Sequence, residues 1–191
     1  MRLKKPICYV NHLQGHIYSP FLAPEAPAPE SVFPFLSLVV SGGHTCLVRV
    51  DALGKSTLLG QTIDDAAGEA FDKGANLLGL GYPGGPIMDK LGREGNPDFH
   101  AFPRGRAKRE RGLINGMDSD LCFSYSGLKT ALLYYLKQNP IEDGNQQLLA
   151  DVVASYQEAI VDSLVRKPAK AMKDIDTLAV GGGVSLNSRL R

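Results

Sequence analysis

A short polar turn between two apolar segments constrains this chain most. The segment Val39-Val40-Ser41-Gly42-Gly43-His44-Thr45 continues one apolar run, residues 35–40, and leads into another, residues 46–50. Two apolar runs joined by a glycine turn predict adjacent strands. The glycines leave backbone N–H groups open to an anionic group such as a nucleotide phosphate, and Ser41 and Thr45 add hydroxyls. A plain turn without a ligand is the alternative, because such short motifs are common.

The composition is that of an ordinary globular protein. The 191 residues allow one domain with a core, or somewhat more. Hydrophobic content is 43% and net charge is +1, so no overall field points to nucleic acid. The three cysteines, at positions 8, 46 and 122, are widely spaced, which predicts no disulfide framework and fits a cytoplasmic location. The apolar run at 7–10 is too short for a signal sequence or a membrane span.

Basic residues gather in one segment in spite of the balanced net charge. They are Arg104, Arg106, Lys108, Arg109 and Arg111. A solvated loop and a contact with a nucleic-acid phosphate backbone both fit this pattern.

Apolar spacing along the chain predicts alternating strands and helices. Expected strands cover residues 7–10, 35–40, 46–50, 56–62 and 178–180. Expected helices begin at Asn11, at Asp64-Asp65, after the turn 82–86, at Ser126, near Leu149 and at Asn187. The second of them would bury Ala67, Ala70, Phe71 and Leu78. Pro168 is expected to kink or stop the long helix. The five prolines of residues 19–34 predict an extended connector, and the alternation indicates the α/β class.

Three glycine turns stand at expected element ends, at Gly42-Gly43, Gly84-Gly85 and 181–183. Together they suggest loops that close around one nucleotide, with Asn187 placed to contact a base or a phosphate. No G-x-x-x-x-G-K-[ST] segment is present, which excludes a P-loop, and no G-x-G-x-x-G follows a strand.

Two further patterns carry ionisable groups. His12 and His16 are four residues apart, so on a helix they share one face, as two ligands of a metal ion or as an ordinary histidine pair. The motif H-E-x-x-H is absent. Asp65, Glu69 and Asp72 form a helical stripe that faces away from the apolar side. Such a stripe is either an exposed face or the lining of a cleft that holds hydroxyls, a metal or an amine.

Six segments, taken in order, resemble the tRNA threonylcarbamoyladenosine transferase family, long misnamed O-sialoglycoprotein endopeptidase. They are residues 11–16 (NHLQGH), 40–45 (VSGGHT), 63–73 (IDDAAGEAFDK), 82–86 (YPGGP), 123–130 (FSYSGLKT) and 181–187 (GGGVSLN). Because they span nearly the whole chain in order, they are far more specific than the histidine pair alone.

The resemblance implies an actin-like ATPase fold of the ASKHA, ribonuclease H-like class, with two lobes around a nucleotide. Residues 1–34 would end the N-terminal lobe, and residues 35–191 would form an incomplete C-terminal lobe with the nucleotide-binding loops. The family starts with a phosphate-binding lobe and ends with a Thr-Asp-Asn-Gly-type segment that supplies a metal-binding aspartate. We therefore expect this chain to be truncated at both ends.

The resemblance also implies an acyltransferase reaction. The threonylcarbamoyl group of threonylcarbamoyl-AMP moves to the exocyclic amine of the adenosine beside the anticodon of tRNA. By matching positions, His12 and His16 would bind one divalent ion, Fe²⁺ or Zn²⁺. The positions that would hold the adenine nucleotide or adenylate are Val39, Val40, Ser41, Gly42, Gly43, Asp72, Gly85, Asp89 and Asn187. No residue stands out as a required general base.

The expected partners are tRNA and protein subunits of the TsaB and TsaE type, without a membrane. Alternatives are a non-catalytic scaffold subunit or inactive fragment of the tRNA-modifying complex, a metallopeptidase, or an ASKHA-type kinase. The histidine pair argues for the catalytic reading over the scaffold and the kinase.

Overall fold

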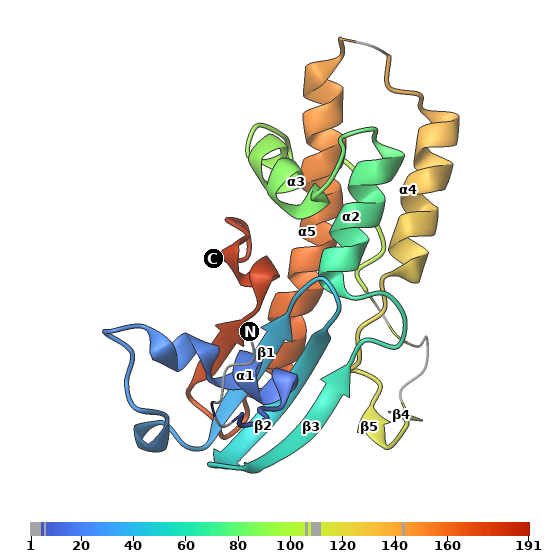
Figure 1. The fold of residues 1–191 in the computed structure, drawn as a ribbon. Helices are drawn as coiled ribbons and strands as arrows, with labels where there is room; N and C mark the ends of the chain where they lie inside the picture. Colours follow the sequence, from blue (N-terminus) through green and yellow to red (C-terminus); the bar gives the residue numbers. More distant parts are fainter. Residues whose placement is uncertain (1–4, 6, 106, 108–111, 143) are drawn as a thin grey trace.

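A four-stranded mixed sheet forms one end of the fold, and the longer helices extend beyond it (Figure 1). The computed structural model describes residues 5, 7–105, 107, 112–142 and 144–191. Strands β1 (Phe35–Val40), β2 (Thr45–Ala52) and β3 (Lys55–Gln61) form the expected antiparallel meander. Strand β6 (Leu178–Gly181) pairs with β1 in parallel, which gives the order β3-β2-β1-β6. The predicted α/β class is confirmed.

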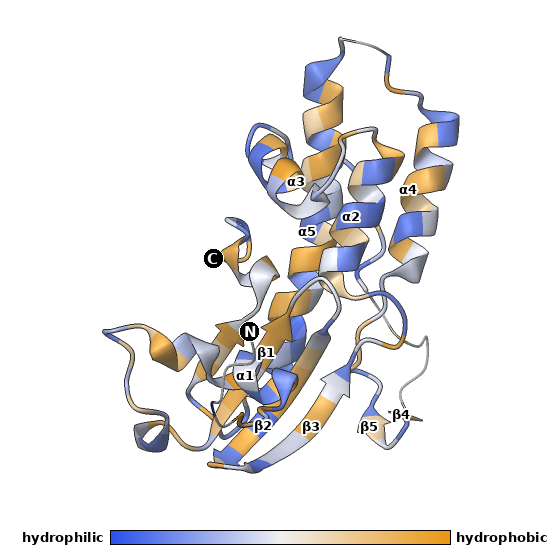
Figure 2. Ribbon diagram, in the orientation of Figure 1, coloured by the Kyte–Doolittle hydropathy of each residue, from blue (hydrophilic) through white to orange (hydrophobic). Residues whose placement is uncertain are grey.

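Strand β1 is buried on both faces, which explains its unbroken apolar sequence. Leu36, Leu38 and Val40 join the core under the main helices. Phe35 and Val39 join a second core under the N-terminal segment. Figure 2 shows the hydrophobic colour concentrated on this central strand, whereas the helices carry both colours.

Helices cover the two faces of the sheet unequally. One side carries α2 (Ala67–Leu77), α4 (Ser126–Gln138) and α5 (Gln146–Ala171), and α3 (Gly84–Gly92) packs on α2 and α5. The other side carries α1 (His12–Tyr18) and the connector, with 3-10 helices η1 (Ser19–Leu22) and η2 (Pro29–Ser31). A small hairpin of β4 (Leu113–Ile114) and β5 (Met117–Asp118) follows α3, and 3-10 helix η3 (Gly183–Leu186) follows β6. None of the described helices has the length and hydropathy of a bilayer-spanning helix.

Side chains from elsewhere in the sequence cap the starts of three helices. The N–H of Ala67, the first residue of α2, donates to Thr45 Oγ1 at 2.7 Å. The N–H of Gly84, at the start of α3, donates to Asp72 Oδ1 at 2.8 Å. Asp64 accepts the backbone N–H of Ser126, the first residue of α4, and four hydrogen bonds in all from residues 124–126. These caps satisfy N–H groups that a helix leaves unpaired, and they tie each helix to a neighbouring element.

The roles expected of Asp64-Asp65 and of the Ser126 hydroxyl are therefore wrong, although α4 does begin at Ser126. Asp64 and Asp65 do not open α2, which starts after Ala66; Asp64 serves α4, and Asp65 pairs with Lys73. The Ser126 hydroxyl does not cap α4 but donates to Asp64. At α1 the expectation is confirmed, because Asn11 Oδ1 accepts the N–H of Gln14.

Expectations at four other element ends have mixed outcomes. Residues 7–10 form no strand, and Ile7, Tyr9 and Val10 are exposed. Leu78 is the residue that ends α2; it is half-buried and packs against the core, as expected in part. Pro168 does not stop α5, which runs on to Ala171; the proline lacks one donor, but its carbonyl still accepts the N–H of Met172. A single turn begins at Asn187, as a capped helix start would: its backbone is extended, its Oδ1 accepts the N–H groups of Arg189 and Leu190, and its carbonyl accepts the N–H of Arg191.

Candidate functional site

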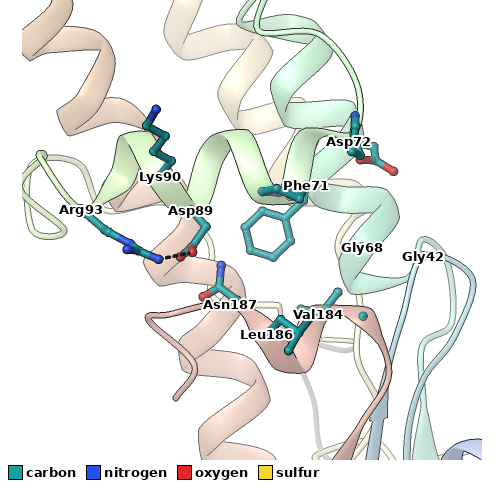
Figure 3. A pocket seen from close by; sticks show the side chains of 14 residues that line it. Gly42, Gly68, Phe71, Asp72, Asp89, Lys90, Arg93, Val184, Leu186 and Asn187 are labelled. Carbon is teal, nitrogen blue, oxygen red and sulfur yellow. Dashed lines mark hydrogen bonds and ion pairs between the residues drawn. The ribbon is translucent and has the colours of Figure 1, made fainter.

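A cavity of about 720 Å³ lies between α2, α3 and the segment that follows β6 (Figure 3). It is lined by Gly42, Gly68, Phe71, Asp72, Pro83, Gly85, Pro86, Asp89, Lys90, Arg93, Gly183, Val184, Leu186 and Asn187. Each of the three glycine turns singled out from sequence thus contributes one lining residue, Gly42, Gly85 or Gly183. The structure brings together loops that lie more than one hundred residues apart.

Strand register and close backbone contacts explain why the turns converge. Strands β1 and β6 are parallel, and Val39 pairs with Gly181. The segments that follow the two strands therefore leave the sheet side by side, at the C-terminal ends of the strands. Gly182 has a φ of +98°, and a Cβ there would lie 2.3 Å from the carbonyl oxygen of Val40. A Cβ on Gly68 of α2 would lie 2.7 Å from the carbonyl oxygen of Ser41. Only glycine permits these two approaches.

The three turn glycines that line the cavity differ from Gly68 and Gly182, because a side chain would fit at each of them. Gly42, Gly85 and Gly183 have φ angles outside the left-handed region, and a Cβ on any of them would meet no atom within 4 Å. Neither backbone conformation nor packing of the described residues requires glycine at these positions. Their missing side chains leave room in which a ligand can approach the backbone directly.

Three of the expected nucleotide-binding side chains line this cavity, namely Asp72, Asp89 and Asn187. The Asp72 carboxylate caps α3 at Gly84. Asp89 Oδ1 accepts the N–H and the hydroxyl of Ser188 at 3.0 and 2.6 Å, and its Oδ2 accepts from Arg93 at 3.0 Å. Burial alone would raise the pKa of Asp89, but the bonds from Ser188 and Arg93 outweigh it and hold that pKa below its ordinary value. Asp89 is therefore ionised, and its hydrogen bonds with Ser188 link α3 to the segment after η3.

Four expected positions do not line the cavity, namely Val39, Val40, Ser41 and Gly43. Val39 and Val40 are fully buried in β1, so their side chains face the core. Ser41 Oγ accepts the N–H of His44 at 3.0 Å, and Gly43 is exposed beside Gly42. The hydroxyl of Thr45 is buried and accepts the N–H of Ala67, so it serves as a helix cap within the protein.

Only one member of the acidic stripe reaches the cavity. Lys73 lies 2.6 Å from Asp65 Oδ1 and 2.8 Å from Glu69 Oε1. The hydrogen bond from Lys73 is the main cause that lowers the pKa of Glu69. Asp65 and Glu69 thus form an ion-pair cluster on α2, and Asp72 is the carboxylate of the stripe that lines the cavity.

Three imidazoles gather next to the glycine turn. The His12 and His16 ring centroids lie 4.6 Å apart on α1, and His44 lies 5.4 Å from His12 and 6.4 Å from His16. Partial burial, and then the nearby charges of His12 and His44, lower the pKa of His16. A neutral imidazole is the form that binds a metal.

The histidine pair fits a divalent ion as two ligands of a larger set. Both rings project from consecutive turns of one short helix, as an i, i+4 metal pair requires. In the described part of the chain, no group of three or more His, Cys, Asp or Glu side chains is arranged to hold a metal.

Some lining residues were not predicted from sequence. Arg93 and Lys90 bring positive charge to the cavity, and Val184 and Leu186 bring apolar surface. The spacing of Asp89 and Arg93, four residues apart on an expected helix, is a signal that could have identified Arg93. Phe71 was expected in the core, and it both packs there and lines the cavity.

Most of the basic cluster lies outside the described residues, namely Arg106, Lys108, Arg109 and Arg111. Arg104 is described, and its guanidinium donates to the backbone carbonyl of Glu158 at 3.4 Å.

Sequence comparison identifies a protein family that matches this chain. The profile of the TsaD family, described as tRNA N6-adenosine threonylcarbamoyltransferase, matches residues 1–191. Proteins of that name from Anaeromyxobacter sp. (strain Fw109-5) and Nostoc punctiforme are 51% identical over 190 residues and 49% identical over 189 residues. Each alignment covers 98% of this chain, but 53% and 52% of the relative. A third relative, from Prosthecochloris aestuarii, is 48% identical over 99% of this chain and 55% of its own length. The chain thus spans about half the length of these relatives.

Proposed function

Since this chain belongs to the tRNA N6-adenosine threonylcarbamoyltransferase family, we propose that it forms the nucleotide-binding part of an enzyme that modifies tRNA. The reaction moves the threonylcarbamoyl group of threonylcarbamoyl-AMP to the exocyclic amine of the adenosine beside the anticodon. The new bond joins that amine nitrogen to the carbamoyl carbon, the bond from that carbon to the phosphate oxygen breaks, and AMP leaves together with the one proton that the amine loses.

One observation carries this proposal. Gly42, Gly85 and Gly183 line a single cavity although the fold requires glycine at none of them. A ligand that lies against the backbone explains why side chains are missing there. The α3 N-terminus, at Gly84 and Gly85, adds a partial positive charge that favours the phosphate of an adenylate.

The other lining residues suit the rest of the adenylate. Val184 and Leu186 offer apolar surface for a base, and Asn187 offers an amide for its polar edge or for the ribose. Lys90 and Arg93 balance the charge of an anionic ligand. We assign the same ligand to the turn formed by Val39, Val40, Ser41 and Gly43, which would contribute through its backbone.

His12 and His16 would hold the divalent ion, Fe²⁺ or Zn²⁺. When bound, such an ion supplies Lewis-acid polarisation of the threonylcarbamoyl group. The residues of this chain contribute mainly by position, because an adenine amine is a weak nucleophile and benefits from being held beside an activated carbonyl.

The family also suggests the wider setting. We propose that residues 1–34 end the first lobe, and residues 35–191 form part of the second lobe, of an actin-like ASKHA fold. The partners would be tRNA, contacted through the basic segment 104–111, and subunits of the TsaB and TsaE type. We place the enzyme in the cytoplasm, because tRNA is found there and because its reducing conditions keep thiols such as Cys46 and Cys122 free.

Nucleotide binding and group transfer test this proposal separately. Calorimetry with ATP and with AMP should show uptake at one site by this chain. The complete polypeptide that carries it should incorporate labelled threonine into tRNA when threonylcarbamoyl-AMP is supplied. Uptake of neither nucleotide would refute the cavity assignment, and intact binding without transfer would favour a scaffold subunit.

A further inference from the structure

The carboxamide of Asn187 is oriented by its protein partners. Its Oδ1 accepts the backbone N–H groups of Arg189 and Leu190, both at 3.1 Å. Its Nδ2 donates to Gln157 Oε1 at 2.8 Å. An amide oxygen accepts and an amide nitrogen donates, so two donors on one side and one acceptor on the other allow a single orientation. The Nδ2 group carries a second hydrogen, and Asn187 lines the cavity.

Gln157 supplies the acceptor in this arrangement from a different layer of the fold. It projects from α5 and is 3% exposed, and Asn187 is 7% exposed. A hydrogen bond between two such buried polar side chains restricts both, because any other orientation would leave a buried polar group unpaired. The contact therefore fixes which atom of Asn187 is presented to the cavity.

We propose that Gln157 is a positioning residue for ligand binding. It holds the Asn187 carboxamide so that the free Nδ2 hydrogen donates to an acceptor atom of a nucleoside in the cavity. That acceptor is a ring nitrogen of the base or a ribose oxygen. This inference rests on the proposed nucleotide site. It adds that Asn187 donates a hydrogen bond to the nucleotide and does not accept one from it.

Other contacts keep the same segment attached when Gln157 is changed. Ser188 bonds to Asp89 of α3, and Arg189 pairs with Glu158 of α5 at 2.6 Å. Loss of the Gln157 acceptor should therefore free the amide of Asn187 without detaching the turn. A positioning role predicts weaker and less selective binding in a folded chain.

The test compares Gln157→Met, which keeps the length but removes the acceptor, with Gln157→Glu, whose carboxyl oxygen still accepts. Calorimetric titration with ATP should show about a 10-fold loss of affinity for Gln157→Met and recovery to within about 2-fold for Gln157→Glu. The control is Glu158→Gln, which weakens the adjacent Arg189 ion pair and leaves the amide contact intact.

A series of analogues identifies the acceptor. ATP analogues that lack one ring nitrogen (1-, 3- or 7-deaza) or one ribose hydroxyl (2′- or 3′-deoxy) should include one for which the Gln157→Met penalty disappears. Glu158→Gln should keep the wild-type pattern of analogue affinities. A penalty that is the same for every analogue, or an equal loss in Gln157→Glu, would overturn the proposal.

Amide hydrogen exchange without ligand separates this inference from the proposed function. Gln157→Met should speed exchange at the N–H groups of Arg189 and Leu190 by about 5-fold or more, because a freed amide no longer caps them. Unchanged exchange there would refute the positioning role even in a chain that binds no nucleotide. Failure of the wild-type chain to bind any nucleotide, with faster exchange in the variant, would refute the proposed function alone.

Discussion

Two adjacent glycines at the start of α3 should respond in opposite ways to the same substitution. A methyl group on Gly84 would lie 2.6 Å from Ala75 Cβ and 2.8 Å from the Cα of Asp72. A methyl group on Gly85 would meet no atom within 4 Å, and the φ angle of Gly85 is outside the left-handed region. The two positions share their helix and their chemistry, so Gly84→Ala is a matched control for Gly85→Ala.

The magnitudes follow from these contacts. Carbon atoms pack at about 3.5–4.0 Å, so Gly84→Ala overlaps α2 by about 1 Å and should cost about 1–3 kcal/mol. Gly85→Ala removes unfolded-state freedom without strain and should add about 0.4–1 kcal/mol of stability. If a nucleotide lies against the Gly85 backbone, the added methyl group overlaps it instead, and about 1–3 kcal/mol corresponds to a 5- to 150-fold weaker Kd.

Thermal unfolding and calorimetry with ATP measure the two effects independently. For a chain of this size each kcal/mol shifts the Tm by about 2–4 °C, so Gly84→Ala should lower the Tm and Gly85→Ala should raise it slightly. Gly85→Ala should nevertheless bind ATP less tightly than the wild-type chain. Unchanged affinity in a stable Gly85→Ala variant would show that the ligand does not approach this backbone, and the argument from the cavity glycines would fail.

Three further substitutions test the caps and the histidine pair. Asp64→Asn should lower the free energy of unfolding by about 1 kcal/mol at pH 7, and Asp65→Asn by less. Burial opposes the shift, but bonds from Ser124, Tyr125 and Ser126 hold the pKa of Asp64 below its ordinary 3.8. The difference from wild type should therefore persist above about pH 4 and shrink below it, as urea titrations at several pH values would reveal. Thr45→Val leaves the buried N–H of Ala67 without its acceptor and should cost about 1–3 kcal/mol in the same assay, and a smaller loss than Thr45→Ser would contradict the cap. His12→Ala should abolish stoichiometric Zn²⁺ or Fe²⁺ uptake by the complete polypeptide, measured by elemental analysis, whereas full retention would exclude the pair as ligands.

Much of the sheet could be predicted because its signals are contiguous in sequence. The run 35–40 is buried on both faces, so every residue in it is apolar or small and the strand is evident without any partner. The glycine turn after it and the apolar run beyond it likewise predict β2. The run 7–10 has the same apolar character but forms no strand, because hydropathy alone does not supply a neighbour with which to pair.

Helix starts were harder to predict from the sequence, because the side chains that cap them come from distant parts of the chain. Ser126 and the Asp64-Asp65 pair have the residue types of local caps, and the sequence cannot reveal that Asp64 instead reaches residues 124–126. The same limit applies to the network of Asp89, Ser188 and Arg93. Helical spacing relates Asp89 to Arg93, but only the fold brings Ser188 to them.

The glycines show why the site itself needed the structure. In the sequence Gly42, Gly68, Gly84 and Gly85 look alike, each inside a short motif with small or polar neighbours. The structure divides them by what a Cβ would meet: backbone atoms at Gly68, α2 at Gly84, and open space at Gly42 and Gly85. The first kind of glycine is required by packing in this chain. The second kind is required by neither backbone conformation nor packing in the described protein, and the proposed ligand gives it a reason that folding does not.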